Sequence, residues 1–99
     1  MAVERLVGML VSDDMMYQQY RENMMPILHR YGGAFKYDFK IDEVLKSAVK
    51  EPMNRVFIIR FDSQENMSAF FNDKNYLQVR QEFFEPSVSS FEEIATYSC

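Results

Sequence analysis

Cysteine and histidine are nearly absent from this sequence. The 99 residues include one cysteine, Cys99, at the C-terminal end, and one histidine, His29. A single cysteine cannot form a disulfide within the chain, and neither residue has a second cysteine or histidine at the spacing that a metal site needs. No phosphate-binding loop, nucleophile elbow or paired CxxC occurs either. The sequence therefore predicts no metal site and no cofactor.

Long apolar runs and clusters of positive charge are also missing. The apolar stretch from Leu6 to Val11 is followed by Asp13 and Asp14. It is far shorter than the roughly 20 apolar residues of a membrane span, and too short for a signal peptide core, so we expect a cytoplasmic protein. The eleven lysines and arginines are scattered and the net charge is −4. This composition argues against partners such as nucleic acid or an anionic membrane.

Apolar and aromatic side chains, in contrast, are abundant. They make up 47% of the chain and include nine phenylalanines and six tyrosines, enough for one hydrophobic core. There is no internal repeat, low-complexity tract or linker, so residues 1–99 are expected to form a single domain.

The spacing of apolar residues predicts the order strand, helix, strand, strand, helix, strand. We expect strands at residues 3–11, 34–41, 54–62 and 87–97, a helix capped by Ser12 or Asp13 and ended by Gly32, and two short helices capped by Asp62 or Ser63 and by Asp73. This order is typical of the α+β class and the ferredoxin-like βαββαβ fold. Right-handed crossovers then give an antiparallel sheet of strand order 4-1-3-2 with the helices on one face.

The first predicted helix contains Pro26, which removes one backbone hydrogen bond and pushes against the preceding turn. The apolar stripe of the helix keeps its phase across the proline, so we expect a bend and not an end. The stripe contains Met16, Tyr17, Tyr20, Met24, Ile27, Leu28 and Tyr31. His29 lies on the opposite side of this helix and should face solvent.

Alternation in the strands assigns side chains to the two faces of the sheet. In the third strand Phe57, Ile59 and Phe61 share one face, while Val56, Ile58 and Arg60 share the other. If the aromatic set meets the helices, Val56 and Ile58 lie on the uncovered face. In the second strand the same rule groups Phe35, Tyr37, Phe39 and Ile41 against Lys36, Asp38 and Lys40. An apolar uncovered sheet face predicts a homodimer that pairs sheet against sheet.

Three segments, YRENMMPILHRYGGAFKY, EVLKSAVKEPMNRVFIIRFDS and AFFNDKNYLQVRQ, resemble the family called domain of unknown function 1330. The similarity runs from Tyr17 to Tyr97. Its most specific elements are the spacing from Phe70 to Tyr76 and the set Tyr20, Arg21, Pro26, Tyr31, Gly32 and Gly33. That family belongs to the dimeric α+β barrel superfamily, so the resemblance implies a ferredoxin-like protomer whose sheet pairs with a second copy to enclose a barrel. It implies no activity.

This chain departs from the family's common pattern at two places. Ser47 and Val49 stand where the family often has glycine and tryptophan, and Arg60 and Asp62 stand where it often has an acidic residue and a proline. Relatives elsewhere in the superfamily include cofactor-free monooxygenases, haem-degrading enzymes and small-molecule sensors. None of their catalytic residues can be matched here.

Four residues are candidates for a ligand pocket. Arg60 sits in an otherwise apolar strand, where its planar guanidinium can hold an anion or pair with an acid such as Glu92 or Glu93. Tyr20 and Tyr76 can offer hydroxyls at the boundary of helix and sheet, or serve as core residues whose hydroxyls reach the surface. Tyr37 is a similar candidate, and the sequence does not decide which face of the sheet it occupies.

Two functions fit these features, and a third fits less well. The first is a dimeric barrel that binds a small apolar or aromatic molecule. The second is an enzyme of the same superfamily, a cofactor-free monooxygenase or an isomerase. The third is an RNA-binding module with the same element order, but RVFIIRFD lacks the glycines of its main sheet motif, and Ile59 stands where a stacking ring is expected.

Overall fold

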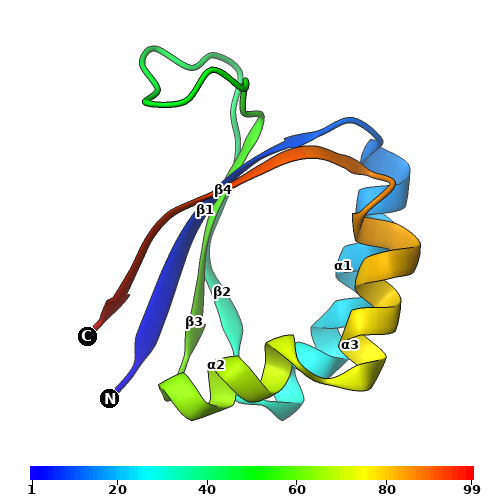
Figure 1. Cartoon of the computed structure of the whole chain (residues 1–99), viewed down its shortest axis with the longest axis vertical. Helices are drawn as coiled ribbons and strands as arrows, with labels where there is room; N and C mark the ends of the chain where they lie inside the picture. Colours follow the sequence, from blue (N-terminus) through cyan, green and yellow to red (C-terminus); the bar gives the residue numbers. More distant parts are fainter.

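A four-stranded antiparallel sheet carries all the helices on one of its faces (Figure 1). The computed structural model describes all residues from 1 to 99. The sheet order is β2-β3-β1-β4, which confirms the predicted ferredoxin-like α+β arrangement. The elements are β1 (Val3–Val11), α1 (Asp14–Arg30), β2 (Ala34–Lys40), β3 (Arg55–Phe61), α2 (Gln64–Phe71), α3 (Lys74–Val79), the π-helical turn η1 (Arg80–Phe84) and β4 (Val88–Ser98).

Side-chain caps begin the helices at the predicted places. The carboxylate of Asp13 accepts a hydrogen bond from the Met16 amide at 3.1 Å, and the hydroxyl of Ser63 accepts one from the Asn66 amide at 3.1 Å. Asp73 caps α3 in the same way. Each cap satisfies an amide that has no partner within its helix. α1 ends before Gly32, whose φ of 71° is a left-handed conformation that glycine adopts at low cost.

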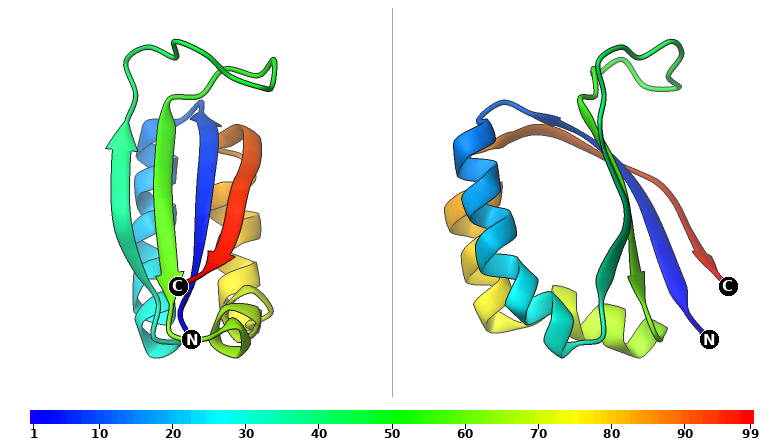
Figure 2. Two further views of the ribbon diagram at one scale, coloured as in Figure 1. Left: turned by 90° about the vertical axis from the view of Figure 1, so that its left-hand side faces the viewer. Right: turned by 180° about the vertical axis from the view of Figure 1, so that it is seen from behind.

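α1 passes through Pro26 as one continuous helix that curves gently along the sheet (Figure 2). Its inner face is buried as predicted at Tyr17, Tyr20, Met24, Ile27 and Leu28. His29 is exposed, also as predicted. The buried core lies between this face and the sheet, where Phe57, Ile59 and Phe61 of β3 point toward the helices. The other face of the sheet has no helix over it (Figure 2, left).

The predicted grouping of side chains in β2 is wrong, because the register with β3 shifts between Phe35 and Tyr37. This shift marks a β-bulge, at which β2 has one residue more than β3. The bulge reverses the alternation of side chains between the two faces of the sheet. Phe35 faces the helices and packs edge-on against Phe57, with ring centroids 5.2 Å apart. Beyond the bulge Tyr37 lies on the uncovered face, and Asp38 turns toward the helices.

The segment between β2 and β3, residues 41–54, projects beyond the end of the sheet toward the uncovered side (Figure 1). Its last residue, Asn54, is hydrogen-bonded to the end of β1, an inner strand of the sheet. The Asn54 side chain accepts a hydrogen bond from the Val11 amide at 2.8 Å and donates one to the Val11 carbonyl at 2.9 Å. None of the helices is long and apolar enough to cross a membrane.

Candidate functional site

An aromatic cavity of about 280 Å³ lies between the helices and the sheet. Most of its lining residues are hydrophobic. They come from β1, β2, β3 and β4 on the sheet side and from α1, α2, α3 and η1 on the helix side. Leu77 of α3, which is 44% exposed, is part of the lining where it meets solvent. The aromatic members of the lining are Tyr17, Tyr20, Phe35, Phe57, Phe71, Tyr76, Phe84 and Phe91.

Two tyrosine hydroxyls meet in the wall of this cavity. Tyr20 of α1 and Tyr76 of α3 are both buried, and their hydroxyl oxygens are 2.9 Å apart. Burial raises the pKa of both phenols, for Tyr20 well above its ordinary value. The pair is therefore neutral near pH 7, with one hydroxyl donating to the other and further hydrogen-bonding capacity left at the oxygens.

Three charged side chains also line the cavity: Arg5 of β1, Arg80 of η1 and Glu93 of β4. The guanidinium of Arg5 lies 4.8 Å from the ring centroid of Phe71, and that of Arg80 lies 5.1 Å from the ring centroid of Phe84. Arginine over the face of an aromatic ring is attracted by the ring's charge distribution. These contacts hold both cations against the aromatic wall.

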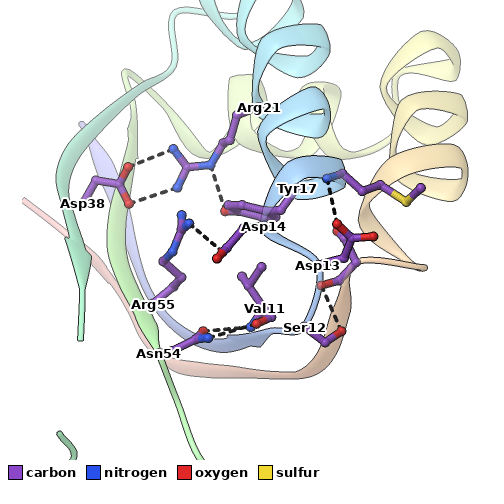
Figure 3. Close-up of polar contacts among 11 residues, drawn as sticks. Val11, Ser12, Asp13, Asp14, Tyr17, Arg21, Asp38, Asn54 and Arg55 are labelled. Atoms are coloured by element: carbon purple, nitrogen blue, oxygen red, sulfur yellow. Dashed lines mark hydrogen bonds and ion pairs between the residues drawn. The ribbon is translucent and has the colours of Figure 1, made fainter. Parts of the chain in front are cut away.

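A buried arginine, Arg21 of α1, makes hydrogen bonds and ring contacts to residues of the cavity wall (Figure 3). It makes two parallel hydrogen bonds to Asp38, at 2.9 and 3.0 Å, and donates a third to the Tyr17 hydroxyl at 2.8 Å. Its guanidinium also lies 3.8 Å from the ring centroid of Phe35. Burial acts to lower the pKa of Arg21, but the bonds to Asp38 and Tyr17 outweigh it and raise the pKa. Arg21 is thus fully partnered and positions two aromatic members of the lining.

The sequence-predicted pocket residues fall on opposite sides of the sheet. Tyr20 and Tyr76 line the cavity, whereas Arg60 and Tyr37 do not. Tyr37 is 51% exposed on the uncovered face, opposite Ile58 in the strand register. Arg60 points to the same face and does not reach the cavity.

The acid that pairs with Arg60 is Glu4 of β1, and the expectation of Glu92 or Glu93 is wrong. Glu4 stands directly across from Arg60 in the strand pairing, and the two side chains are 3.1 Å apart. Glu93 lies on the helix face instead, because a register shift in β4 reverses the alternation there.

Glu4 is the centre of a polar cluster on the uncovered face. It is 1% exposed, and besides Arg60 it accepts hydrogen bonds from Lys36 at 2.9 Å and from the Tyr97 hydroxyl at 2.9 Å. The bonds from Lys36 and Tyr97, with that from Arg60, lower the pKa of Glu4 to about 2. A network of this kind rigidifies the sheet and offers no free group for chemistry.

No group of three or more His, Cys, Asp or Glu side chains is arranged to hold a metal ion. The polar groups that face the cavity are hydroxyls, guanidiniums and one carboxylate. These can bind an organic ligand through hydrogen bonds and charge.

Comparison with known proteins identifies the family. A family model described as a domain of unknown function, DUF1330, matches residues 6–87. The chain belongs to the DUF1330 family. No curated protein matches the sequence.

Solved structures show that the DUF1330 chain shares its fold with several small proteins. A protein of unknown function from Rhodopseudomonas palustris is 16% identical with a TM-score of 0.83, and the match covers 99% of this chain and 82% of the other. A dimeric protein of unknown function with a ferredoxin-like fold from Bacteroides fragilis is 12% identical with a TM-score of 0.62, covering 99% and 96%. SnoaB, a cofactor-independent oxygenase from Streptomyces nogalater, is 11% identical with a TM-score of 0.66, covering 99% and 92%.

Sequence reasoning missed the charged residues of the DUF1330 cavity. Arg5 alternates with Val3 and Val7, which are buried on the helix side of β1, and an arginine in that series was the available signal. Arg80 carried no comparable signal, because its direction depends on the π-helical turn that follows α3.

Proposed function

We propose that this DUF1330 protein binds a small aromatic molecule in the cavity between its helices and its sheet. The observation that supports the proposal is an aromatic-walled cavity with a few polar groups in its lining, Tyr20, Tyr76, Arg5 and Arg80. Ligand sites in proteins typically combine an apolar wall with a small number of placed polar groups. The proposed site lies within one protomer, and not in a barrel between two.

The size of the cavity limits the ligand. Ligand pockets usually measure roughly 300 to 1,000 Å³, and the volume of this cavity, about 280 Å³, lies just below that range. A molecule of one or two rings fits such a volume. The facing aromatic rings can stack against it edge-on or offset.

Calorimetric titration with a two-ring probe, 2-naphthol, tests this proposal. We expect binding to the wild-type protein, and Leu77→Trp should weaken it roughly tenfold or more by narrowing the cavity where it opens. Leu45→Trp is the matched control, because Leu45 is 89% exposed in the 41–54 segment and far from the lining. Absence of binding to the wild-type protein, or equal loss in both variants, would refute the site.

An enzymatic role is the second candidate, supported by fold likeness to a cofactor-independent oxygenase and by the buried hydroxyl pair. Fold likeness alone does not carry an activity. If the cavity activates a bound phenol toward oxygen, the protein should cause oxygen uptake with 1-naphthol, and Tyr20→Phe should slow it. If adding the protein does not change the rate of oxygen uptake, the oxygenase role is refuted and ligand binding remains the proposed function. An isomerase role would need the same cavity and a proton acceptor, for which Glu93 is the available carboxylate.

We further propose that the protein is a homodimer joined through the uncovered sheet face. Val56 and Ile58 are half-buried there, and Tyr37, Phe39 and Ile94 are exposed beside them. Their closeness on one face makes an apolar patch of the kind that usually marks an interaction surface. The dimeric Bacteroides fragilis protein of the same fold supports this assembly.

Light scattering on Ile58→Glu tests the dimer. A charge on the sheet face should give a monomer, whereas Met15→Glu should stay dimeric, because Met15 is 83% exposed on α1, away from that face. A wild-type monomer at micromolar concentration would overturn the proposal.

We also propose that the protein does not bind nucleic acid. The net charge is −4, and on the uncovered face the cations Lys36 and Arg60 are both engaged by Glu4. Phosphate binding depends on free, clustered positive charge. Fluorescence anisotropy with a labelled oligonucleotide should show no binding, and affinity that falls steeply with salt would contradict this.

A further inference from the structure

Positive charge exceeds negative charge in the cavity lining, although the chain as a whole is acidic. Arg5 and Arg80 face a single carboxylate, that of Glu93, while the net charge of the protein is −4. An excess of positive charge within an acidic protein needs a physical reason. The hydrogen-bond and ion-pair partners of the two arginines indicate this reason.

Arg5 has no hydrogen-bonded partner. Its Nε is buried and makes no hydrogen bond, and the nearest carboxylate oxygen, Oε1 of Glu93, lies 3.6 Å away. That distance is too long for a hydrogen bond. The other carboxylate oxygen of Glu93 accepts a hydrogen bond from the Thr96 hydroxyl, which turns it toward its own strand. A buried polar group without a partner is costly, so a donor at this position favours an incoming acceptor.

Arg80 has no carboxylate partner, whereas Arg5 makes one long ion pair, with Glu93 at 3.6 Å. It makes none of the ion pairs in the structure, whereas Arg21, Arg55 and Arg60 each lie within 3.2 Å of an acidic oxygen. Its guanidinium lies over the face of the Phe84 ring. Arg5 and Arg80 are thus less completely paired than Arg21, Arg55 and Arg60.

Arg5, Arg80 and Tyr76 line the same cavity. Burial raises the pKa of Tyr76, and the hydrogen bond with Tyr20 and the positive charges of Arg80 and Arg5 act in the opposite direction. Arg5 comes from the sheet and Arg80 from the helix layer. The sheet and the helix layer thus each bring one arginine to the cavity that Tyr76 also lines.

We infer that the ligand of this cavity is an aromatic anion, whose carboxylate or phenolate oxygen is held between Arg5 and Arg80 beside the Tyr76 hydroxyl. The planar fork of arginine matches the oxygens of a carboxylate, and charge-assisted hydrogen bonds are the stronger kind. The aromatic wall receives the ring of the ligand. The inference rests on the proposed function and adds the chemical class of the ligand.

The test compares two probes of nearly equal shape, 2-naphthoate and its neutral analogue 2-naphthamide, by calorimetric titration of the full-length protein. We expect 2-naphthoate to bind roughly tenfold or more tighter, as a charge-assisted hydrogen bond predicts. Arg80→Met should remove most of this preference, because it should weaken the binding of 2-naphthoate much more than that of 2-naphthamide. Arg30→Met is the matched control for the loss of one charge, because Arg30 is exposed at the end of α1.

A second set of measurements keeps the inference testable if Arg80→Met fails to fold. Added salt should weaken the binding of 2-naphthoate and not that of 2-naphthamide, and Arg5→Lys should retain part of the preference. Equal affinity for both probes, unchanged by Arg80→Met, would overturn the anion preference and leave the proposed function standing. Failure of both probes and of 2-naphthol to bind would remove the proposed function itself.

Discussion

The hydrogen bond between Tyr20 and Tyr76 gives a prediction at the scale of single residues. Tyr20→Phe leaves the buried Tyr76 hydroxyl without this partner, so the free energy of unfolding should fall by about 1 to 2 kcal/mol. Adding Tyr76→Phe removes the orphaned group, so the double variant should lose less than the sum of the two single losses. Urea unfolding of the four proteins measures this cycle.

Tyr37→Phe is the control for the cycle, because the Tyr37 hydroxyl is exposed and makes no hydrogen bond. Its effect should stay within about 0.5 kcal/mol. Strictly additive losses in the double variant would show that the two hydroxyls do not depend on each other.

Glu4 links stability to pH. Its pKa in the folded protein is lowered from 4.5 to about 2, chiefly by the hydrogen bonds from Lys36 and Tyr97. A carboxylate with a lowered pKa contributes stability that is fully present above its ordinary pKa and is lost as the pH falls through the folded-state value. The contribution of Glu4 should therefore decline between pH 4.5 and about 2.

Thermal unfolding across this pH window tests the role of Glu4. Glu4→Gln should lower stability at neutral pH and flatten the fall on acidification. Glu22→Gln should leave the curve unchanged, because Glu22 is an exposed acid of α1 that takes part in no ion pair. If the stability of Glu4→Gln falls with pH in parallel with that of the wild-type protein, Glu4 is not the group that links stability to pH in this window.

At the element scale, Asn54 extends the pairing of β1 with its side chain. It satisfies both the amide and the carbonyl of Val11, and its own amide donates to the Met9 carbonyl at 2.9 Å. Asn54→Ala leaves the two Val11 groups unpaired and should cost about 1 to 3 kcal/mol. Hydrogen exchange should show faster exchange of the Val11 amide, while the amides of β4 outside this end stay protected. Unchanged exchange at Val11 would contradict this role.

Element order and helix caps could be predicted from the sequence because both depend on local chemistry. The side chains of Asp13, Ser63 and Asp73 each accept a hydrogen bond from the backbone amide three residues later, so a short sequence pattern is enough to predict each cap. The bulge in β2 could not be predicted, since the register shift depends on pairing with β3. Tyr37 and Asp38 consequently exchanged faces relative to the prediction.

Two of the four polar residues of the proposed site could be predicted from the sequence for the same reason. Tyr20 falls on the apolar stripe of α1, and Tyr76 follows a cap, so both were predicted to lie between helix and sheet. Arg5 and Arg80 come from separate layers, and only the folded chain brings them to one cavity. The partner of Arg60 likewise depends on which residue of β1 stands across from it.

At the scale of the whole molecule, the proposed dimer makes stability depend on protein concentration. A partner that binds only the folded state stabilises it by mass action. The melting temperature of the wild-type protein should rise with concentration, whereas that of Ile58→Glu should be lower and constant. Calorimetric scans over a hundredfold range of protein concentration measure this dependence. A wild-type melting temperature that does not change on dilution would argue for a stable monomer.

The first and last strands lie side by side at one end of the sheet, and the Cys99 amide donates to the Ala2 carbonyl at 2.9 Å (Figure 1). A short bridge of glycine and serine could therefore join residue 99 to residue 1, and new ends could be opened in the 41–54 segment. Such a circular permutant would keep every strand pair and every wall of the cavity. It would also show whether folding of the sheet needs the β2–β3 connection to be continuous.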